Sequence, residues 1–233
     1  MPVGYYYGFD WTYVVFVLPA LIFSLWASFN VKSTFSKYTK VASERGMTGY
    51  DAARMILDAN GLYDVQIGRI SGDMTDHFDP KANMIRLSDT VHDVRSAAAV
   101  GVAAHEAGHA VQYAVGYYPM KLRASIIPLT NLGSTIAWPL VLLGVMLSAE
   151  PLAKIGVLLF GTVVVFQLVT LPVEFNASRR AVEALKSRGM SGDGLDAAKK
   201  VLTAAALTYV AALAAALGSF LRLLSIANRS RRD

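Results

Sequence analysis

The chain has 233 residues, of which 54% are hydrophobic and only 17% are charged, and its mean hydropathy is +0.41. This balance is too apolar for an average soluble domain and indicates an integral membrane protein. The sequence contains no cysteine, which excludes disulfides and thiolate metal sites, so a transition metal would need histidine and carboxylate ligands. Lys and Arg flank the apolar segments, which favours a lipid bilayer over nucleic acid as the partner of this chain, whose net charge is +5.

The first apolar run, residues 11–29, carries no charge and is about long enough to cross a bilayer as a helix. It lacks the basic start and small-residue cleavage site of a signal peptide, so we expect an uncleaved anchor in residues 1–30. Basic residues follow directly: Lys32, Lys37, Lys40 and Arg45. The positive-inside rule therefore predicts that residues 31–120 lie in the cytoplasm.

Two further uncharged runs, residues 126–147 and 155–173, are separated by a short polar connector. This pattern predicts a transmembrane hairpin within residues 121–173, with both ends on the same side of the membrane. Lys121 and Arg123 precede the hairpin and agree with a cytoplasmic start.

A fourth apolar run, residues 201–221, either spans the membrane or packs as a buried helix. If the run spans, the basic tail at the end of the segment 201–233 lies outside, which contradicts the positive-inside rule. The length of the run nevertheless favours spanning. The tail residues concerned are Arg222, Arg229, Arg231 and Arg232.

The polar segment 31–120 contains the signals of a small mixed domain. Thr48 is a suitable cap for a helix over residues 48–60, and Gly61 is a suitable stop. Residues 65–71 and 77–88 alternate well enough for short strands, with a turn beginning at Asp79. The fold class predicted is therefore mainly α and integral membrane, with about four transmembrane helices, a zincin-like helix and a small β-sheet.

Residues 93–115 predict an uninterrupted helix that contains an HExxH motif and ends at Gly116. His105 and His109 are four residues apart, so both imidazoles lie on one face and can bind one Zn(II) ion. Glu106, one step round the helix, can reach a water on that ion and act as general base. This spacing predicts a zinc-dependent peptidase.

A catalytic zinc site usually has three protein ligands and one open position. The candidates for the third are Glu174, Glu183, His77 and His92. Glu174 begins the segment 174–200 after the hairpin, and two crossings return it to the cytoplasmic side that carries the histidines. The alternative interpretation of Glu174 is a solvated carboxylate paired with Arg179 or Arg180. Glu183 and His92 are predicted to be surface residues.

The HEAGH helix and the stretch PVEFNASRRA resemble the bacterial membrane zinc metallopeptidases of the YugP-like family, and the similarity extends over almost the whole chain. The resemblance implies His105, His109 and Glu174 as zinc ligands and Glu106 as general base. A more distant similarity to HtpX-like gluzincin membrane peptidases implies an acidic residue four positions after the ligand glutamate. Ser178 stands there instead, so a hydroxyl or a backbone carbonyl would have to orient a zinc histidine.

The expected activity is endoproteolysis of a peptide or membrane-protein substrate in a bacterial cell membrane, with the site on the cytoplasmic face. We expect the substrate to lie extended along a sheet edge near residues 84–87. His77, Arg179 and Tyr117 are candidate donors to the oxyanion. The alternatives are a catalytically silent zinc-containing scaffold or chaperone, against which Glu106 argues, and a metal transporter, which would carry polar ligands within its spans.

Overall fold

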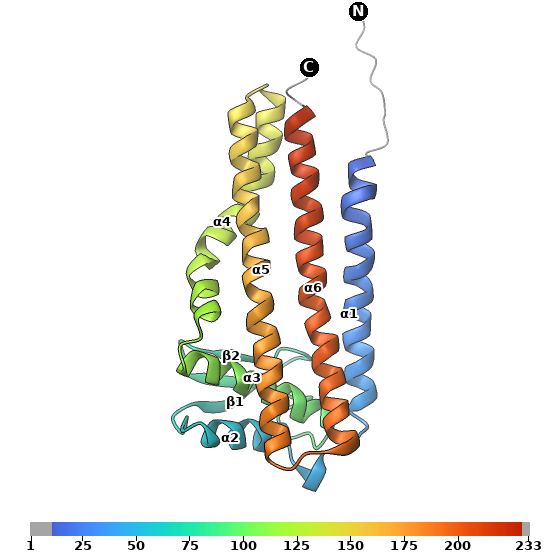
Figure 1. Cartoon of the computed structure of the whole chain (residues 1–233), viewed down its shortest axis with the longest axis vertical. Helices are drawn as coiled ribbons and strands as arrows, with labels where there is room; N and C mark the ends of the chain where they lie inside the picture. Colours follow the sequence, from blue (N-terminus) through green and yellow to red (C-terminus); the bar gives the residue numbers. More distant parts are fainter. Residues whose placement is uncertain (1–10, 230–233) are drawn as a thin grey trace, which may run out of the picture. The chain divides into compact units, whose positions relative to one another are not determined.

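The computed structural model describes residues 11–229, so Arg231 and Arg232 of the predicted basic tail lie outside the described residues. The elements in chain order are η1 (Tyr13–Val17), α1 (Leu18–Tyr38), η2 (Glu44–Gly46), α2 (Gly49–Ala59), β1 (Gln66–Ile70), β2 (His77–Asp79), β3 (Met84–Ser88), α3 (Ala97–Ala114), α4 (Tyr118–Met146), α5 (Glu150–Ser187) and α6 (Gly192–Arg229) (Figure 1).

Four helices of the described chain are long and apolar enough to cross a membrane: Tyr13–Tyr38, Tyr118–Met146, Glu150–Ser187 and Gly192–Asn228. The predicted fold class is confirmed, because the chain is mainly helical with four candidate spans and one small sheet. The fourth apolar run belongs to the long helix α6, whose length meets the requirement for a span.

The chain divides into two compact units, and each of the four long helices, α1, α4, α5 and α6, contributes residues to both units. The helical unit contains the described residues up to Leu25, Ile126–Gln167 and the described residues from Ala211 onward. The mixed unit contains Trp26–Ser125 and Leu168–Val210.

In the helical unit, α4 and α5 form a helical hairpin with a short connection at residues 147–149 (Figure 1). Gly144 faces Ala153 so closely that a Cβ atom would collide with the Ala153 backbone. Such small residues permit the close backbone approach that packs helices in lipid, where no hydrophobic force drives helices together. The buried cluster of this unit is Ala137, Val141, Ala153, Val157, Phe160, Leu223 and Ala227.

The sheet of the mixed unit has the strand order β1-β3-β2, with β1 parallel and β2 antiparallel to β3. The predicted strand regions and the turn after Asp79 are confirmed. Strand β3 lies in the centre of the sheet, and its Ile85 and Leu87 side chains are fully buried in the core shared with α2 and α3. The prediction that residues 84–87 offer a free edge to a peptide is therefore wrong, since both edges of β3 are already paired.

Helix α2 begins as predicted, with Thr48 as its cap. The Thr48 hydroxyl accepts a hydrogen bond from Asp51 N, and the Asp51 side chain accepts one from Thr48 N, which makes a complete capping box. The helix stops before Gly61, whose φ of +73° suits glycine.

Helix α3 begins at Ala97, four residues later than predicted. Ser96 is its cap and accepts from Ala99 N, and an isolated β-bridge to Ala42 accompanies the extended conformation of Ser96. The helical pattern at 93–96 was thus overridden by a local cap and a tertiary pairing. Helix α3 packs on α2 and supplies more residues to the buried core of this unit than any other element, including Val100, Ala103 and Ala107.

Candidate metal centre

Two histidines and one glutamate converge between α3 and α5 in the mixed unit. His105 and His109 lie one helical turn apart, with ring centroids separated by 4.6 Å. Glu174 Oε2 lies 3.3 Å from His105 Nε2 and 3.4 Å from His109 Nε2. One possible ligand atom from each residue lies within 4.8 Å of the other two, so all three can face a single ion.

The close approach of α3 and α5 depends on Gly108, inside the HEAGH motif. A Cβ atom at this position would lie 2.7 Å from Ala177 O of α5. Such a distance is too short for a carbon and a carbonyl oxygen, so only glycine permits this spacing. Gly108 thereby brings the α3 histidines within reach of Glu174.

Each histidine is oriented through its Nδ1 atom. His109 Nδ1 lies 2.9 Å from Gln112 Oε1, and His105 Nδ1 lies 3.1 Å from Ser178 Oγ. Both Nε2 atoms are thereby left to face Glu174. The hydroxyl of Ser178 occupies the orienting position that the sequence had left without a carboxylate.

The Gln112 amide is itself fixed by two acceptors on α5. Its Nε2 atom donates to Val173 O at 2.8 Å and to Asn176 Oδ1 at 3.0 Å, and Asn176 Oδ1 also accepts from Arg180 Nε. Gln112 Oε1 is therefore the acceptor toward His109, which places the proton on His109 Nδ1 and the lone pair on Nε2. That is the tautomer a metal ligand requires.

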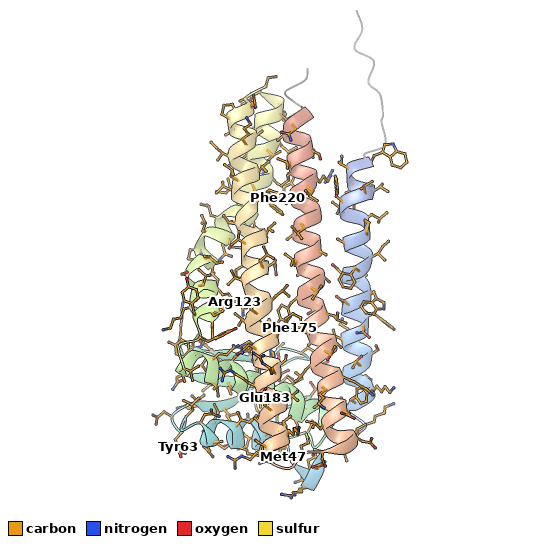
Figure 2. All side chains as sticks on the ribbon, in the orientation of Figure 1. Met47, Tyr63, Arg123, Phe175, Glu183 and Phe220 are labelled. Atoms are coloured by element: carbon orange, nitrogen blue, oxygen red, sulfur yellow. The ribbon has the colours of Figure 1, made fainter. Side chains whose placement is uncertain are left out.

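Glu174 is only 2% exposed, and its two oxygens have different surroundings. Arg123 Nη1 donates to Oε1 at 3.0 Å, whereas Oε2 is buried and has no hydrogen-bond partner among the described residues. The ion pair is made with Arg123, which Figure 2 labels on α4, and not with Arg179 or Arg180 as the alternative reading supposed.

These surroundings fit a divalent cation. An unsatisfied buried carboxylate oxygen is costly, and a cation between it and two imidazole nitrogens would remove that cost. Burial opposes protonation of His109, but its interaction with Glu174 and the charge of Glu106 outweigh burial, and the pKa of His109 is raised. The same negative potential attracts a metal ion, and two imidazoles with one carboxylate form a ligand set that suits zinc.

Glu106 lies on the same helix, 7% exposed. Its Oε2 atom accepts a hydrogen bond of 3.0 Å from Phe78 N of the edge strand β2. Asp76, just before β2, accepts from Ser88 N and Ser88 Oγ and so ties that strand to β3. Burial raises the pKa of Asp76, and the charge of Glu106 adds to this shift.

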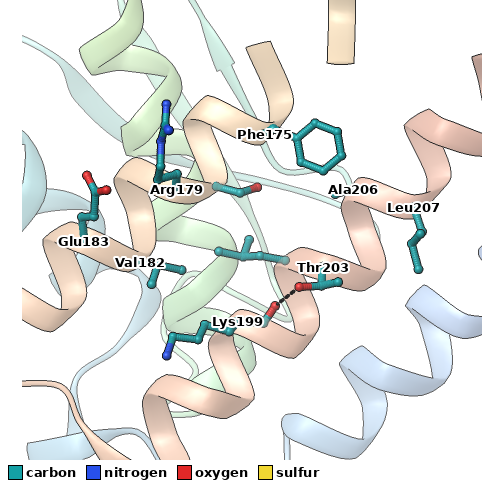
Figure 3. Close-up of a pocket in the computed structure, with 10 residues that line it drawn as sticks. Phe175, Arg179, Val182, Glu183, Lys199, Thr203, Ala206 and Leu207 are labelled. Atoms are coloured by element: carbon teal, nitrogen blue, oxygen red, sulfur yellow. Dashed lines mark hydrogen bonds between the residues drawn. The ribbon is translucent and has the colours of Figure 1, made fainter. Parts of the chain in front are cut away.

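A cavity of about 280 Å³ opens directly beside His105 and Glu106. Asp76 and Tyr209 also line it. A second groove of about 350 Å³ lies between α5 and α6 and is shown in Figure 3. Ser178 lines this second groove, but His105, Glu106, His109 and Glu174 do not, whereas His105 and Glu106 line the first cavity.

The remaining sequence candidates have other surroundings. His77 Nδ1 contacts Thr75 O at 2.8 Å, and His92 Nδ1 contacts Asp93 at 2.7 Å, so each has a local partner. Arg179 and Glu183 line the second groove, as Figure 3 shows. The Tyr117 hydroxyl donates to Pro172 O at 3.4 Å.

Four residues at the site escaped the sequence reasoning: Gln112, Arg123, Asp76 and Tyr209. Gln112 carried a signal, because position i+3 from His109 shares its helix face. Tyr209 also carried one, as the hydroxyl-bearing aromatic within an alanine-rich apolar run. Arg123 was interpreted only as a charge that flanks a membrane span. Asp76 is brought to the site by the pairing of β2 with β3, which no local sequence pattern indicates.

The family described as "Putative neutral zinc metallopeptidase" matches residues 13–228, and the chain belongs to this family. A relative with 46% identity over 215 residues is the "Putative membrane protease YugP" of Bacillus subtilis (strain 168). The alignment covers 92% of this chain and 96% of the relative. No solved structure gives a significant match.

Proposed function

We propose that this chain is a membrane-embedded zinc endopeptidase of the gluzincin type, with His105, His109 and Glu174 as the zinc ligands. The observation that carries the proposal is the unsatisfied Glu174 Oε2, which faces the Nε2 atoms of both histidines at 3.3 and 3.4 Å. Membership in a family of neutral zinc metallopeptidases supports it. When bound, zinc supplies a water acidified to a pKa of about 7 and a Lewis acid for the scissile carbonyl.

Glu106 is the general base. Its Oε2 atom is held by Phe78 N, so Oε1 is the oxygen left to take a proton from the attacking water and deliver it to the leaving amine. Because one carboxylate oxygen is held in place, the other also has a fixed position. A base with a fixed position accepts the proton faster than a freely moving one.

Tyr209 is the donor to the developing oxyanion in this proposal. It lines the same cavity as Glu106, whereas Arg179 lies in the other groove and His77 and Tyr117 have carbonyl partners. A phenolic hydroxyl can donate one hydrogen bond toward negative charge that appears during peptide hydrolysis.

The peptide is proposed to lie along β2, which is the edge strand beside Glu106. Phe78 N points toward Glu106 and therefore away from β3, and the Phe78 carbonyl is directed to the same side because both belong to one strand residue. That carbonyl can accept a hydrogen bond from an extended substrate, as in β-strand addition. This arrangement replaces the edge that was expected at residues 84–87.

We propose that the site lies on the cytoplasmic face of a bacterial membrane. Lys32 and Lys37 lie at the C-terminal end of the helix that contains the first apolar run, and Lys40 follows that helix, so this charge bias supports the orientation. A reporter inserted at residue 60 is expected to be active on the cytoplasmic side. A reporter that is active only outside would contradict this topology.

Proteolysis by the purified full chain tests the activity. We expect zinc-loaded wild type to cleave an unfolded protein substrate, and Glu106→Gln to bind the same amount of zinc while losing at least about a hundredfold in rate. Equal cleavage by both proteins would remove Glu106 from the mechanism. Zinc binding without any cleavage by wild type would favour the alternative, a catalytically silent zinc-containing scaffold.

A further inference from the structure

The cavity of about 280 Å³ beside Glu106 has walls of two different kinds. Its catalytic side carries His105, Glu106 and Tyr209. Its remaining walls are largely apolar: Val31 and Phe35 of α1, Val102 of α3, and Val201, Leu202 and Ala205 of α6. The apolar walls therefore continue directly from the groups that would perform hydrolysis.

The size and lining of this cavity determine what it can accept. Its volume is enough for on the order of ten water molecules. Water against apolar walls makes few hydrogen bonds, so an apolar group that displaces it gains affinity. Asp76 and Glu106 border the same space and would repel a carboxylate.

We propose that this cavity is the specificity pocket of the enzyme and receives a bulky apolar side chain next to the scissile bond. The inference rests on the proposed peptidase function and names its substrate class: extended peptide segments with leucine, phenylalanine or methionine at the cleavage site. Ala205 of α6 has the smallest side chain among the apolar residues that line the pocket, so a larger residue at this position should fill part of the space.

Neighbouring positions on α6 provide a matched pair of variants. Ala205 lines this cavity, whereas Ala206 lines the second groove, where Figure 3 labels it beside Phe175. Ala205→Leu should fill the proposed pocket, and Ala206→Leu adds the same atoms to the same helix on a different face. Any general effect of a larger side chain on α6 should appear in both variants.

The experiment measures kcat/KM of the detergent-purified full chain on quenched-fluorescent peptides that differ only at the two positions flanking the cut. Leucine, phenylalanine, alanine and aspartate are compared at each position. In parallel, the Glu106→Gln variant is used to measure binding of the same uncleaved peptides by fluorescence anisotropy. This second measurement does not depend on turnover.

We expect wild type to prefer leucine or phenylalanine over alanine at one of the two positions by about tenfold or more, and to reject aspartate. Ala205→Leu should abolish or reverse that preference, and Ala206→Leu should keep it. A uniform rate on all peptides, a preference that survives Ala205→Leu, or an equal loss in both variants would overturn the proposal.

Failure of the peptidase function gives a different result. If zinc-loaded wild type cleaves none of the peptides, the proposed function fails. The anisotropy measurement then tests separately whether the cavity binds apolar side chains. Preferential binding of the apolar peptides that is lost with Ala205→Leu in the Glu106→Gln background would support a binding pocket. Binding without such a preference would overturn it.

Discussion

Gln112 Oε1 lies 2.9 Å from His109 Nδ1, and the amide that carries this oxygen can adopt only one orientation. Both partners of Gln112 Nε2, namely Val173 O and Asn176 Oδ1, are acceptors, so Oε1 must face the histidine. The buried amide thus selects the His109 tautomer whose Nε2 atom is free to bind metal. The side chain is fully buried, so water cannot replace it.

Gln112→Leu should weaken zinc binding by about 10- to 100-fold, because His109 loses the acceptor that fixes its tautomer and ring orientation. Gln112→Glu keeps an acceptor toward His109 Nδ1 but loses the donor to Val173 O and Asn176 Oδ1, so it should retain more zinc affinity than Gln112→Leu while lowering thermal stability. Competition with a chromophoric chelator measures both. Unchanged affinity in the leucine variant, at equal thermal stability, would contradict this role.

Gly108→Ala should separate α3 from α5, because the new Cβ atom would lie 2.7 Å from Ala177 O. We expect a destabilisation of about 1–3 kcal/mol and weaker zinc binding, since the histidines and Glu174 are carried by these two helices. Thermal unfolding and zinc titration provide the readouts. Gly161→Ala is the control, because its Cβ would meet only Phe220 at 3.6 Å and should be tolerated.

Tyr209→Phe removes one hydroxyl from the cavity beside Glu106. In the proposed mechanism kcat should fall by about 10²–10³, as on loss of one oxyanion donor, while zinc content stays unchanged. Tyr117→Phe is the matched control and should retain activity, since that hydroxyl contacts Pro172 O. A loss of activity in Tyr209→Phe that follows loss of zinc would instead give Tyr209 a purely structural role beside Glu174.

The capping box of α2 should make stability depend on pH on the acid side. Hydrogen bonds from the Thr48 side chain and backbone N–H lower the pKa of Asp51 below its ordinary value. Since the folded pKa is the lower one, this stabilisation is present above the unfolded pKa of about 3.9 and is lost as the pH falls below it. Asp51→Ala should therefore cost about 0.5–1 kcal/mol at neutral pH, with the difference from wild type shrinking below about pH 4.

Thermal unfolding at a series of pH values measures that difference. Asp73→Ala, which removes an exposed loop carboxylate, serves as the control and should match wild type throughout. A gap between wild type and Asp51→Ala that persists unchanged at low pH would show that the carboxylate does not act through its charge.

The sequence predicted those features that depend on local patterns. The apolar runs, the Thr48 cap and the i,i+4 spacing of His105 and His109 are each readable within a few residues. The start of α3 was misplaced, because the bridge between Ala42 and Ser96 pairs residues far apart in the chain.

The surroundings of the site required tertiary information. Arg123 and Glu174 are separated by 51 positions, and Phe78 and Glu106 by 28, so no local pattern connects them. The order of the strands is also a global property, which is why the central strand β3 was mistaken for an edge. Ser178 shows the opposite case, since its position suggested an orienting hydroxyl and the structure places it against His105.

Zinc per chain tests the central claim most directly, measured by elemental analysis of detergent-purified wild type, His105→Ala and Glu174→Ala. Ser191→Ala, on the segment between α5 and α6, provides a control outside the site. The account predicts about one zinc in wild type and in the control, with most of it lost from both site variants. Wild type that holds no zinc after reloading, or full occupancy in Glu174→Ala, would contradict it.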